Sequence, residues 1–398
     1  MNPVSLRNLP YPYRAALSIS SDIDCTDTIE KHHAIQTFMR ETIGIDFSNT
    51  FFPYHEGDHF CLFSSRKADK DAIVAQIRSG QIDALHSFGE KSNFTRADAV
   101  RALDELERYG CRVRIWIDHA DASSNLCKFR SCGRGDDRDR PEYHSDLLKR
   151  YGIRFIWTER LTNIVGQGVP LRLESLLCIY DPRHAKDSFL QMTKTILKVA
   201  LSRLGSTKYA HFRTNTVVGP VTLKDGQRFF EFIRFNNHFK GAAVGDTFED
   251  LHYLLAEPVL YRLKQVGGCS IVYTHLGKKF NPTSPGGEKT LQALRRLRLE
   301  SDNGQIWVPP TGAMLEHCLA TRHLTWRGWV NGGQCKINIQ SIEDPLAGPT
   351  AQEELVLKGI TFYTPPGLPA EVTLHGRIPL RIRHNPPDHT GKESVTIV

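Results

Sequence analysis

The sequence contains no long hydrophobic run. No stretch approaches the roughly 20 apolar residues that a membrane-spanning helix needs, and residues 1–12 include Pro10 and Pro12 but no apolar core of a secretory signal. We therefore expect no membrane span and a cytoplasmic location.

The chain also lacks the features of nucleotide- and nucleic-acid-binding proteins. It has no glycine-rich loop with the spacing of a P-loop or a dinucleotide fold, so we expect no nucleotide cofactor. The formal net charge is +7, but Lys and Arg are spread along the chain without a dense basic tail, so we expect no nucleic-acid partner. A positive charge of this size can steer an anionic substrate or simply maintain solubility.

A disulfide framework is not expected either. The nine cysteines are scattered and odd in number, which is typical of reduced thiols in a cytoplasm. Cys127 and Cys132 are close in sequence, but no second pair completes a zinc motif, so we expect free thiols there.

The composition is that of a globular protein. Hydrophobic residues make up 40% of the 398 residues and charged residues 24%, which excludes a disordered or fibrous chain. A chain of this length can form two domains, with an α/β barrel as the larger one.

Short apolar strands alternate with helical stretches over about the first 280 residues, which predicts parallel βα units. For example, residues 95–109 form an amphipathic helix with Asn93 or Thr95 as cap and Gly110 at its end. Residues 112–117 and 153–157 are strands, and residues 144–151 form a helix between them. Such units either close into a barrel or stack into an open, doubly wound sheet.

The pattern changes near His323. Helical periodicity ends, and short β-rich pieces separated by Pro and Gly follow. We therefore predict a barrel domain over residues 1–322 and a small all-β domain over residues 323–398.

Polar side chains follow most of the predicted strands. Because the carboxyl ends of parallel strands share one rim, these side chains would meet there. Loops are polar in general, but histidines and carboxylates predominate here. The segments are Ser20 to Asp24, His86 to Glu90, Asp118 to Asp121, Thr158 to Arg160, Arg234 to Asn237 and Thr274 to Gly277.

Asp22 and Asp24 form the first carboxylate pair at this rim. If the strand continues through them, both point to one face with Cα atoms roughly 6–7 Å apart. Two carboxylates so close favour a cation or a proton between them. Asp24 could instead cap a following helix.

Histidines and one glutamate complete a candidate metal site. His86 and Glu90 are spaced to chelate one ion, although Gly89 interrupts a helical turn there. Together with Asp24 and His119 they form an N/O donor set for Zn2+ or a similar divalent metal. His275 follows the last strong strand and can act as a general acid near neutral pH. His119 and His275 could also be structural.

These motifs resemble the NodB-homology family of polysaccharide deacetylases. Ser21-Asp22-Ile23-Asp24, His86-Ser87-Phe88-Gly89-Glu90 and Tyr273-Thr274-His275 stand where the family has an Asp pair, a His-(Ser/Thr)-x-x-His motif and a late histidine. Ile23 separates the two aspartates, Glu90 replaces the second histidine and the Arg-x-Pro segment is absent. The resemblance implies a distorted (β/α) barrel and a hydrolase that removes acetyl groups from an N-acetylated sugar or polysaccharide.

The resemblance also implies residue roles. Asp22 is the general base and His275 the general acid. The metal ligands are Asp24, His86 and either Glu90 or His119. We expect Trp116, Trp157, Glu159 and Arg234 to contact the carbohydrate.

Two other functions fit the same residues. A glycoside hydrolase would pair Asp22 or Asp24 with Glu159 as its two carboxylates. A non-catalytic glycan-binding protein would tolerate the departures at Glu90 and the Arg-x-Pro segment. The oligomeric state is not encoded in any motif that we recognise.

Overall fold

A computed structural model describes residues 3–398 apart from 56–60, 64–65, 121, 127–132, 173–174, 177–178, 180, 242, 284, 286 and 351–356. The predicted thiols Cys127 and Cys132 lie outside the described residues.

The centre of the molecule is a large, mainly parallel β-sheet. Its strand order is β10-β11-β8-β7-β5-β3-β2-β13-β12-β9, with β14 also paired to β2, and only the β10–β11 pair is antiparallel. The strands are β2 (Ala15–Ser21), β3 (Ser48–Phe51), β5 (Ala84–His86), β7 (Ile115–Ile117), β8 (Phe155–Trp157), β9 (Leu161–Thr162), β10 (Val218–Thr222), β11 (Arg228–Phe232), β12 (Arg234–Phe235), β13 (Cys269–Thr274) and β14 (Ile306–Trp307).

The sheet curls into a half-barrel. The edge strand β9 begins at Leu161, shortly after β8 ends at Trp157. In the same way, β12 begins at Arg234, just after β11 ends at Phe232. These short connections bring the two sides of the sheet towards each other. The two edge strands, β10 and β9, do not pair with each other among the described residues, so the sheet is open. The mixed α/β class is confirmed, whereas the closed barrel of the deacetylase type is not what the structure shows.

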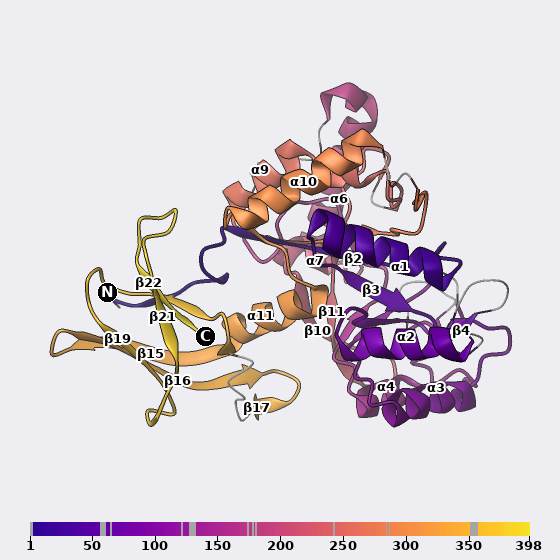
Figure 1. Cartoon of the computed structure of the whole chain (residues 1–398), viewed down its shortest axis with the longest axis horizontal. Coiled ribbons are helices and arrows are strands. Elements are labelled where there is room, and N and C mark those ends of the chain that lie inside the picture. Colours follow the sequence, from indigo (N-terminus) through magenta and orange to yellow (C-terminus); the bar gives the residue numbers. More distant parts are fainter. Residues whose placement is uncertain are drawn as a thin grey trace.

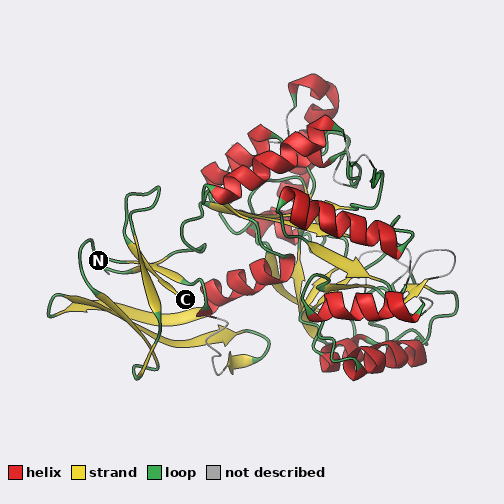
Figure 2. Cartoon of the chain, viewed as in Figure 1, coloured by secondary structure: helices red, strands yellow, loops and turns green. Residues whose placement is uncertain are grey.

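Helices cover the convex side of this sheet (Figures 1 and 2). They are α1 (Ile29–Thr37), α2 (Lys67–Arg78), α3 (Arg96–Arg108), α4 (Ser145–Tyr151), α8 (Leu251–Leu254), α9 (Glu257–Val266) and α10 (Glu288–Asp302), with a π-helical turn at Phe38–Ile43. Helices α6 (Ala185–Arg203), which follows a 3₁₀ turn at Pro182–His184, and α7 (Ala210–Thr214) share a separate small core with Ile164. Helix α3 begins as predicted, because the side chains of Thr95 and Asp98 form a capping box, and Gly110 follows its end with φ +65°.

Strand alternation divides the core into an outer and an inner layer. On β7, Ile115 and Ile117 pack in the cluster that joins β2, β5, β7, β8, β11 and β13, which is the concave side. Trp116 between them packs in the outer cluster, with residues of α2 and α3. Because side chains alternate along a strand, this parity fixes which strand-end residues face the interior.

Helix α11 (Thr311–His323) fills the amino-terminal end of the concave side. Its Met314 and Leu315 belong to the inner cluster, and the hydroxyls of Thr311 and Ser18 lie 2.9 Å apart. The carboxyl ends of the strands are therefore the end at which side chains can surround a cavity.

Residues from 324 onward form two smaller sheets. One contains β15 (Leu324–Asn331), β16 (Gln334–Asp344), β17 (Gly348–Thr350), β19 (Ala370–Leu374) and β20 (Ile378–Pro379); the other joins β18 (Thr361–Tyr363), β21 (Ile382–Asn385) and β22 (Ser394–Ile397) to the N-terminal strand β1 (Ser5–Leu6). The participation of β1 ties the N-terminus to this region (Figure 1). A separate all-β domain with its boundary at residues 322 and 323 stays a prediction.

Among the helices in the described part of the chain, none combines the length and apolarity required to cross a bilayer.

Asp83 gives the fold a pH-dependent stability. Its Oδ2 accepts hydrogen bonds from Ser48 Oγ at 2.6 Å and from the backbone N–H of Gly312 at 3.4 Å, beside the first turn of α11. Burial raises the pKa of Asp83 to about 6, above its ordinary value of 3.8. As pH rises from 4 to 6, the unfolded chain ionises this group before the folded chain does, so stability falls.

We expect this loss to amount to about 2–3 kcal/mol in the free energy of unfolding. Urea denaturation between pH 4 and pH 7 measures it, with Asp83→Asn as the comparison. The dependence in this window should flatten in the variant. An unchanged slope would show that Asp83 does not carry this effect.

Candidate active site

The carboxyl ends of the strands bring six polar side chains to the concave rim. Side chains alternate along each strand, and four polar residues occupy positions that point to the concave side. They are Asp22 after β2, His86 at the end of β5, Arg234 on β12 and His275 after β13. His119 has the parity of the inward-facing Ile115 and Ile117. Asp24, from the turn after β2, joins them.

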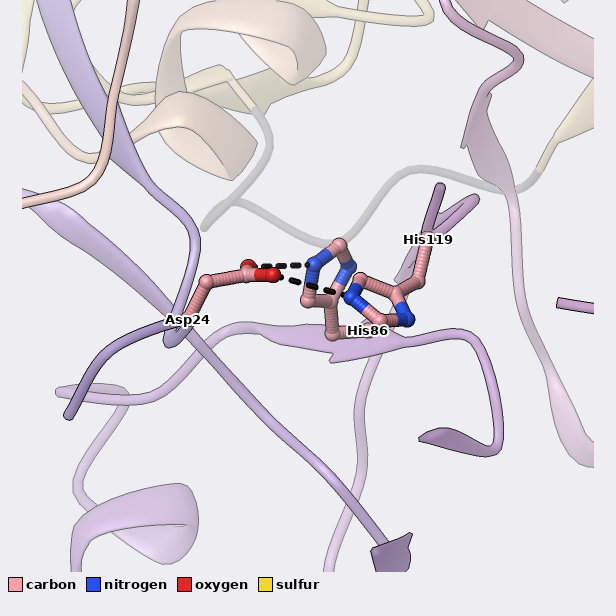
Figure 3. A group of neighbouring side chains, drawn as sticks. All are labelled: Asp24, His86 and His119. Carbon is pink, nitrogen blue, oxygen red and sulfur yellow. Dashed lines mark hydrogen bonds and ion pairs between the residues drawn. The ribbon is translucent and has the colours of Figure 1, made fainter. Parts of the chain in front are cut away.

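Asp24 bridges two histidines (Figure 3). Its Oδ2 lies 2.9 Å from His86 Nε2, and its Oδ1 lies 2.9 Å from His119 Nε2. The two histidines are nearly fully buried, and the side chain of Asp24 is 21% exposed. Burial alone would raise the pKa of Asp24, but the two histidines outweigh burial and hold that pKa well below its usual range. The carboxylate is therefore ionised in its role as a bridge.

His86 turns its Nε2 towards a carboxylate oxygen of Asp24. Its Nδ1 lies 3.4 Å from the carbonyl oxygen of Ile117, which can only accept a hydrogen bond. If Nδ1 carries the proton, the lone pair of Nε2 faces Asp24 Oδ2, another acceptor. Either a second proton or a bound cation must then lie between them. One carboxylate and two imidazoles, whose ligand atoms lie within 4.8 Å of one another, are a donor set that suits Zn2+ or a similar ion.

Asp22 is held as an ionised carboxylate beside this group. It is 1% exposed, and its two oxygens accept hydrogen bonds from the Arg234 guanidinium at 2.7 and 2.8 Å. Burial would raise the pKa of Asp22, but Arg234, followed by His86 and His275, outweighs burial and lowers it. The guanidinium also lies 4.2 Å from the ring centroid of Trp157, a cation–π contact.

His275 forms an ion pair with Asp246. Its Nδ1 lies 2.8 Å from Asp246 Oδ2, and its Nε2 lies 4.0 Å from Asp22 Oδ2 and 3.5 Å from Asp24 Oδ2. Burial would raise the pKa of Asp246, but His275 and then Lys278 outweigh burial and hold that pKa well below its usual range.

Asp22, Asp24 and His275 form a second group with ligand atoms within 4.8 Å. In that group, however, Asp22 is already paired with a buried arginine and His275 with Asp246. The Asp24–His86–His119 group is therefore the better candidate for the metal.

These residues surround a cavity of about 240 Å³. Besides the charged groups, its lining includes the aromatic rings of Trp157 and Tyr273 and the side chains of Asp118, Glu159, Leu161 and Lys278. Aromatic walls with a few convergent polar groups are typical of a small-molecule site.

No family model matches this chain. No curated protein matches it either. Among solved structures, a lysine/ornithine decarboxylase from Vibrio vulnificus, complexed with cadaverine, aligns over 96% of this chain and 88% of that chain, with 8% identity and a TM-score of 0.26. A similarity this weak carries no argument about fold or activity.

The resemblance to the NodB-homology polysaccharide deacetylases is wrong as a family assignment, because neither a family model nor a curated protein of that family matches the chain. It rested on three short motifs, and residues of this kind gather at strand ends in α/β proteins of many families. The site is therefore assigned from the chemistry of its side chains and from the distances between them.

The structure brings together most of the residues that the sequence predicted. Asp22, Asp24, His86, His119 and His275 share the cavity, as do the predicted substrate contacts Trp157 and Glu159. Glu90 on β6 (Gly89–Glu90) is 55% exposed, with Oε1 3.7 Å from His119 Nε2, so it lies at the edge of the group. Their roles stay predictions.

Two predicted substrate contacts are placed elsewhere. Trp116 is fully buried in the outer core layer, and its Nε1 donates to Asp118 Oδ1 at 2.8 Å, so it cannot stack on a sugar. Its parity on β7 is opposite to that of the inward-facing residues. Arg234 is fully buried as well and is occupied by Asp22, so it positions a carboxylate and does not reach a substrate.

Asp246 and Tyr273 were missed. Asp246 lies in a loop outside any strand, so no strand-end pattern pointed to it. Tyr273 could have been found, because it has the same inward parity on β13 as His275.

Strained backbone gathers at the same rim. Five non-glycine residues just after the strands have φ values of 38° to 64°, namely Cys25, Ser87, Ala120, Glu159 and Lys279. Each follows a strand that contributes to the cavity, and strain of this kind is common where side chains must be aimed at a site.

The buried ion pair between Arg234 and Asp22 is expected to affect the free energy of unfolding. Removing one partner of a buried ion pair leaves the other charge uncompensated, which costs about 3–5 kcal/mol. Arg234→Met should therefore lower the free energy of unfolding by this amount, and adding Asp22→Asn should restore part of it. Chemical denaturation of the two variants measures both values, and equal stability of wild type and Arg234→Met would contradict the expectation.

Proposed function

We propose that this protein is a metal-dependent hydrolase that removes an acetyl group from an N-acetylated sugar or polysaccharide. The observation that carries the proposal is the pairing of an Asp-His-His group with two further, separately held side chains, the ionised Asp22 and the Asp246-bound His275, around one cavity. Such a set combines a metal site, a base and an acid.

A divalent ion held by Asp24, His86 and His119 would supply Lewis acidity and lower the pKa of a water molecule. Zn2+ suits these donors best. Glu90 is close enough to His119 to act as a neighbouring polar group at the open side of the site.

Asp22 is suited to take the proton from the attacking water. Arg234 keeps Asp22 ionised and fixes both of its oxygens, so the carboxylate form that accepts a proton is present beside the candidate metal site. The hydroxyl then adds to the acetyl carbon, and a C–O bond forms.

His275 is suited to protonate the amine that leaves. Asp246 binds its Nδ1, which directs Nε2 towards Asp22 and Asp24. When the C–N bond breaks, the proton on Nε2 passes to the nitrogen, and acetate and a free amino sugar are the products. Trp157 and Tyr273 provide apolar surfaces against which a sugar ring can lie.

Acetate release tests the proposal. The metal-loaded protein is incubated with N-acetylglucosamine oligomers, and acetate and free amine are quantified with and without a chelator. We expect equal amounts of both products, lost with the chelator and restored by Zn2+.

The other two functions give different results in the same assay. New reducing ends that persist in chelator would indicate a glycoside hydrolase using Glu159 as a carboxylate. Binding of the oligomer without any product, under every divalent metal, would indicate a glycan-binding protein. Either outcome would overturn the proposal.

A further inference from the structure

A second cavity adjoins the candidate active site. Its volume is about 300 Å³, and it shares Glu159, Leu161 and Ala243 with the cavity that holds Asp24 and the histidines. The two cavities therefore lie along one continuous depression. The rest of its wall comes from Thr158 and Arg160 after β8, from Lys198 on α6, and from residues 208–212, which lead into α7.

Basic residues outnumber acidic ones in this side pocket. Its lining includes Arg160, Lys198 and Lys208, and one acidic residue, Glu159. Glu231 neutralises Arg160, with Oε2 2.6 Å from Arg160 Nε, but neither lysine has an acidic partner in the part of the chain that the structure describes. Burial, and then Lys194 and Lys208, lower the pKa of Lys198, because a nearby positive charge disfavours its own. A bound anion would relieve that repulsion.

We propose that this side pocket binds a phosphate group carried by the substrate, through Lys198 and Lys208. This inference rests on the proposed function, since it places the acetamido group of a phosphorylated sugar at Asp24 and the phosphate in the adjoining pocket. Phe212 and Leu161 form the apolar remainder of the pocket.

Two ligands and two variants test it. The probes are N-acetylglucosamine 1-phosphate and N-acetylglucosamine. Lys198→Met/Lys208→Met is expected to raise the Kd and the KM for the phosphorylated sugar at least tenfold, with kcat and the values for the neutral sugar unchanged. Lys289→Met, an exposed lysine on α10, is the matched control.

Calorimetric binding distinguishes the failure of this inference from the failure of the proposed function. If the phosphorylated sugar binds through the two lysines but releases no acetate, the phosphate-binding pocket is supported and the proposed hydrolase activity is contradicted. If both sugars bind equally to the wild type, or the double variant loses nothing, the phosphate pocket is overturned.

A different observation concerns the outer surface of α6. The buried face of this helix is made mainly of small polar residues, together with Val199. Ser188, Thr195 and Ser202 are buried, and Thr195 Oγ1 exchanges hydrogen bonds with Asn163 at 2.7 and 3.0 Å. That interaction fixes which face of α6 is turned to the protein.

The outward face of α6 carries large apolar side chains. Phe189 is 61% exposed and Leu197 59%, and Leu204 just beyond the helix is 83% exposed. With Leu190 and Ile196, at 50% and 49%, they form a stripe roughly 120° wide on a helical projection. On the same projection Lys194 lies along one side of the stripe and Arg203 along the other. Thr193 and Lys186 fall within the same range of the projection, but five large exposed apolar side chains on one helix face still mark a contact site.

The charge around the stripe selects the partner. Between residues 185 and 203, the basic residues that do not line the side pocket are Lys186, Lys194 and Arg203, and the only acidic residue is Asp187. A symmetric contact with a second copy would bring these basic residues together, which is unfavourable. An anionic lipid surface instead offers both hydrocarbon for the stripe and negative charge for the lysines.

We infer that α6 binds the surface of an anionic phospholipid bilayer, lying parallel to it. The test is co-sedimentation with vesicles of phosphatidylglycerol and phosphatidylcholine, and with phosphatidylcholine alone. We expect binding to the anionic vesicles that weakens with salt, and little binding to the neutral ones.

Variants locate the contact. Phe189→Glu/Leu197→Glu should lose at least 90% of the vesicle-bound fraction, while Leu299→Glu, which changes a 60% exposed leucine on α10, should retain it. Absence of binding by the wild type, or equal binding by the double variant, would overturn the inference. So would light scattering that shows a dimer which the double variant dissociates, because the stripe would then belong to a second copy.

Discussion

Asp22→Asn is expected to leave the metal bound and to lower kcat for acetate release by about 10²–10⁴-fold, the usual contribution of a general base. The side chain keeps its shape and can still accept one hydrogen bond from Arg234, but it cannot take a proton from water. Asp24, His86 and His119 do not contact Arg234 among the interactions found, so the metal group stays intact. Steady-state kinetics and plasma mass spectrometry of the same preparation measure both effects.

A conservative variant separates this role from a structural one. Asp22→Glu keeps a base in the cavity, so it should recover part of the activity at raised pH, whereas Asp22→Asn should not. Retention of full turnover in Asp22→Asn would exclude Asp22 as the base. Loss of metal in that variant would instead place Asp22 among the ligands.

His86→Ala is expected to abolish stable metal binding. It removes one of two imidazoles and leaves Asp24 with His119 alone at 2.9 Å. Loss of an outer partner of a ligand typically weakens metal affinity by 10–100-fold, so loss of a ligand itself should exceed about 100-fold. Competition with a chromophoric chelator measures the affinity.

His275→Ala is the matched control for this change. Both histidines contact Asp24, His86 Nε2 at 2.9 Å and His275 Nε2 at 3.5 Å, but His275 is engaged by Asp246. We expect His275→Ala to keep the metal and to lose turnover. If His275→Ala loses the metal and His86→Ala keeps it, the ion belongs to the group of Asp22, Asp24 and His275 instead.

Strand periodicity explains how much of the site could be predicted from the sequence. His86 points to the same side of the sheet as Ala84, and His275 to the same side as Cys269 and Ile271. The apolar pattern of each short strand therefore predicts the direction of the polar residue at its end. The same rule, applied strictly, would have excluded Trp116, since Ile115 and Ile117 occupy the inward positions on β7. An aromatic residue near a site is not evidence of contact without its parity.

Other features depend on tertiary structure and left no local signal. Asp246 approaches His275 because the segment after β12 runs past the end of β13, where Thr247 and His275 form an isolated bridge. The curled, open shape of the sheet depends on pairings between strands far apart in sequence, such as β2 with β13. The strand β1 joins a sheet made of the last residues of the chain, which no pattern near the N-terminus indicates.

X-ray absorption spectroscopy on the zinc-loaded protein is the most direct measurement. We expect one ion per chain, coordinated by two imidazole nitrogens and carboxylate oxygen at about 2 Å. This coordination should be lost in His86→Ala and retained in His275→Ala. A protein that retains less than a tenth of an equivalent of any divalent metal, or an ion whose imidazole signal survives in His86→Ala, would contradict a metal site made by Asp24, His86 and His119.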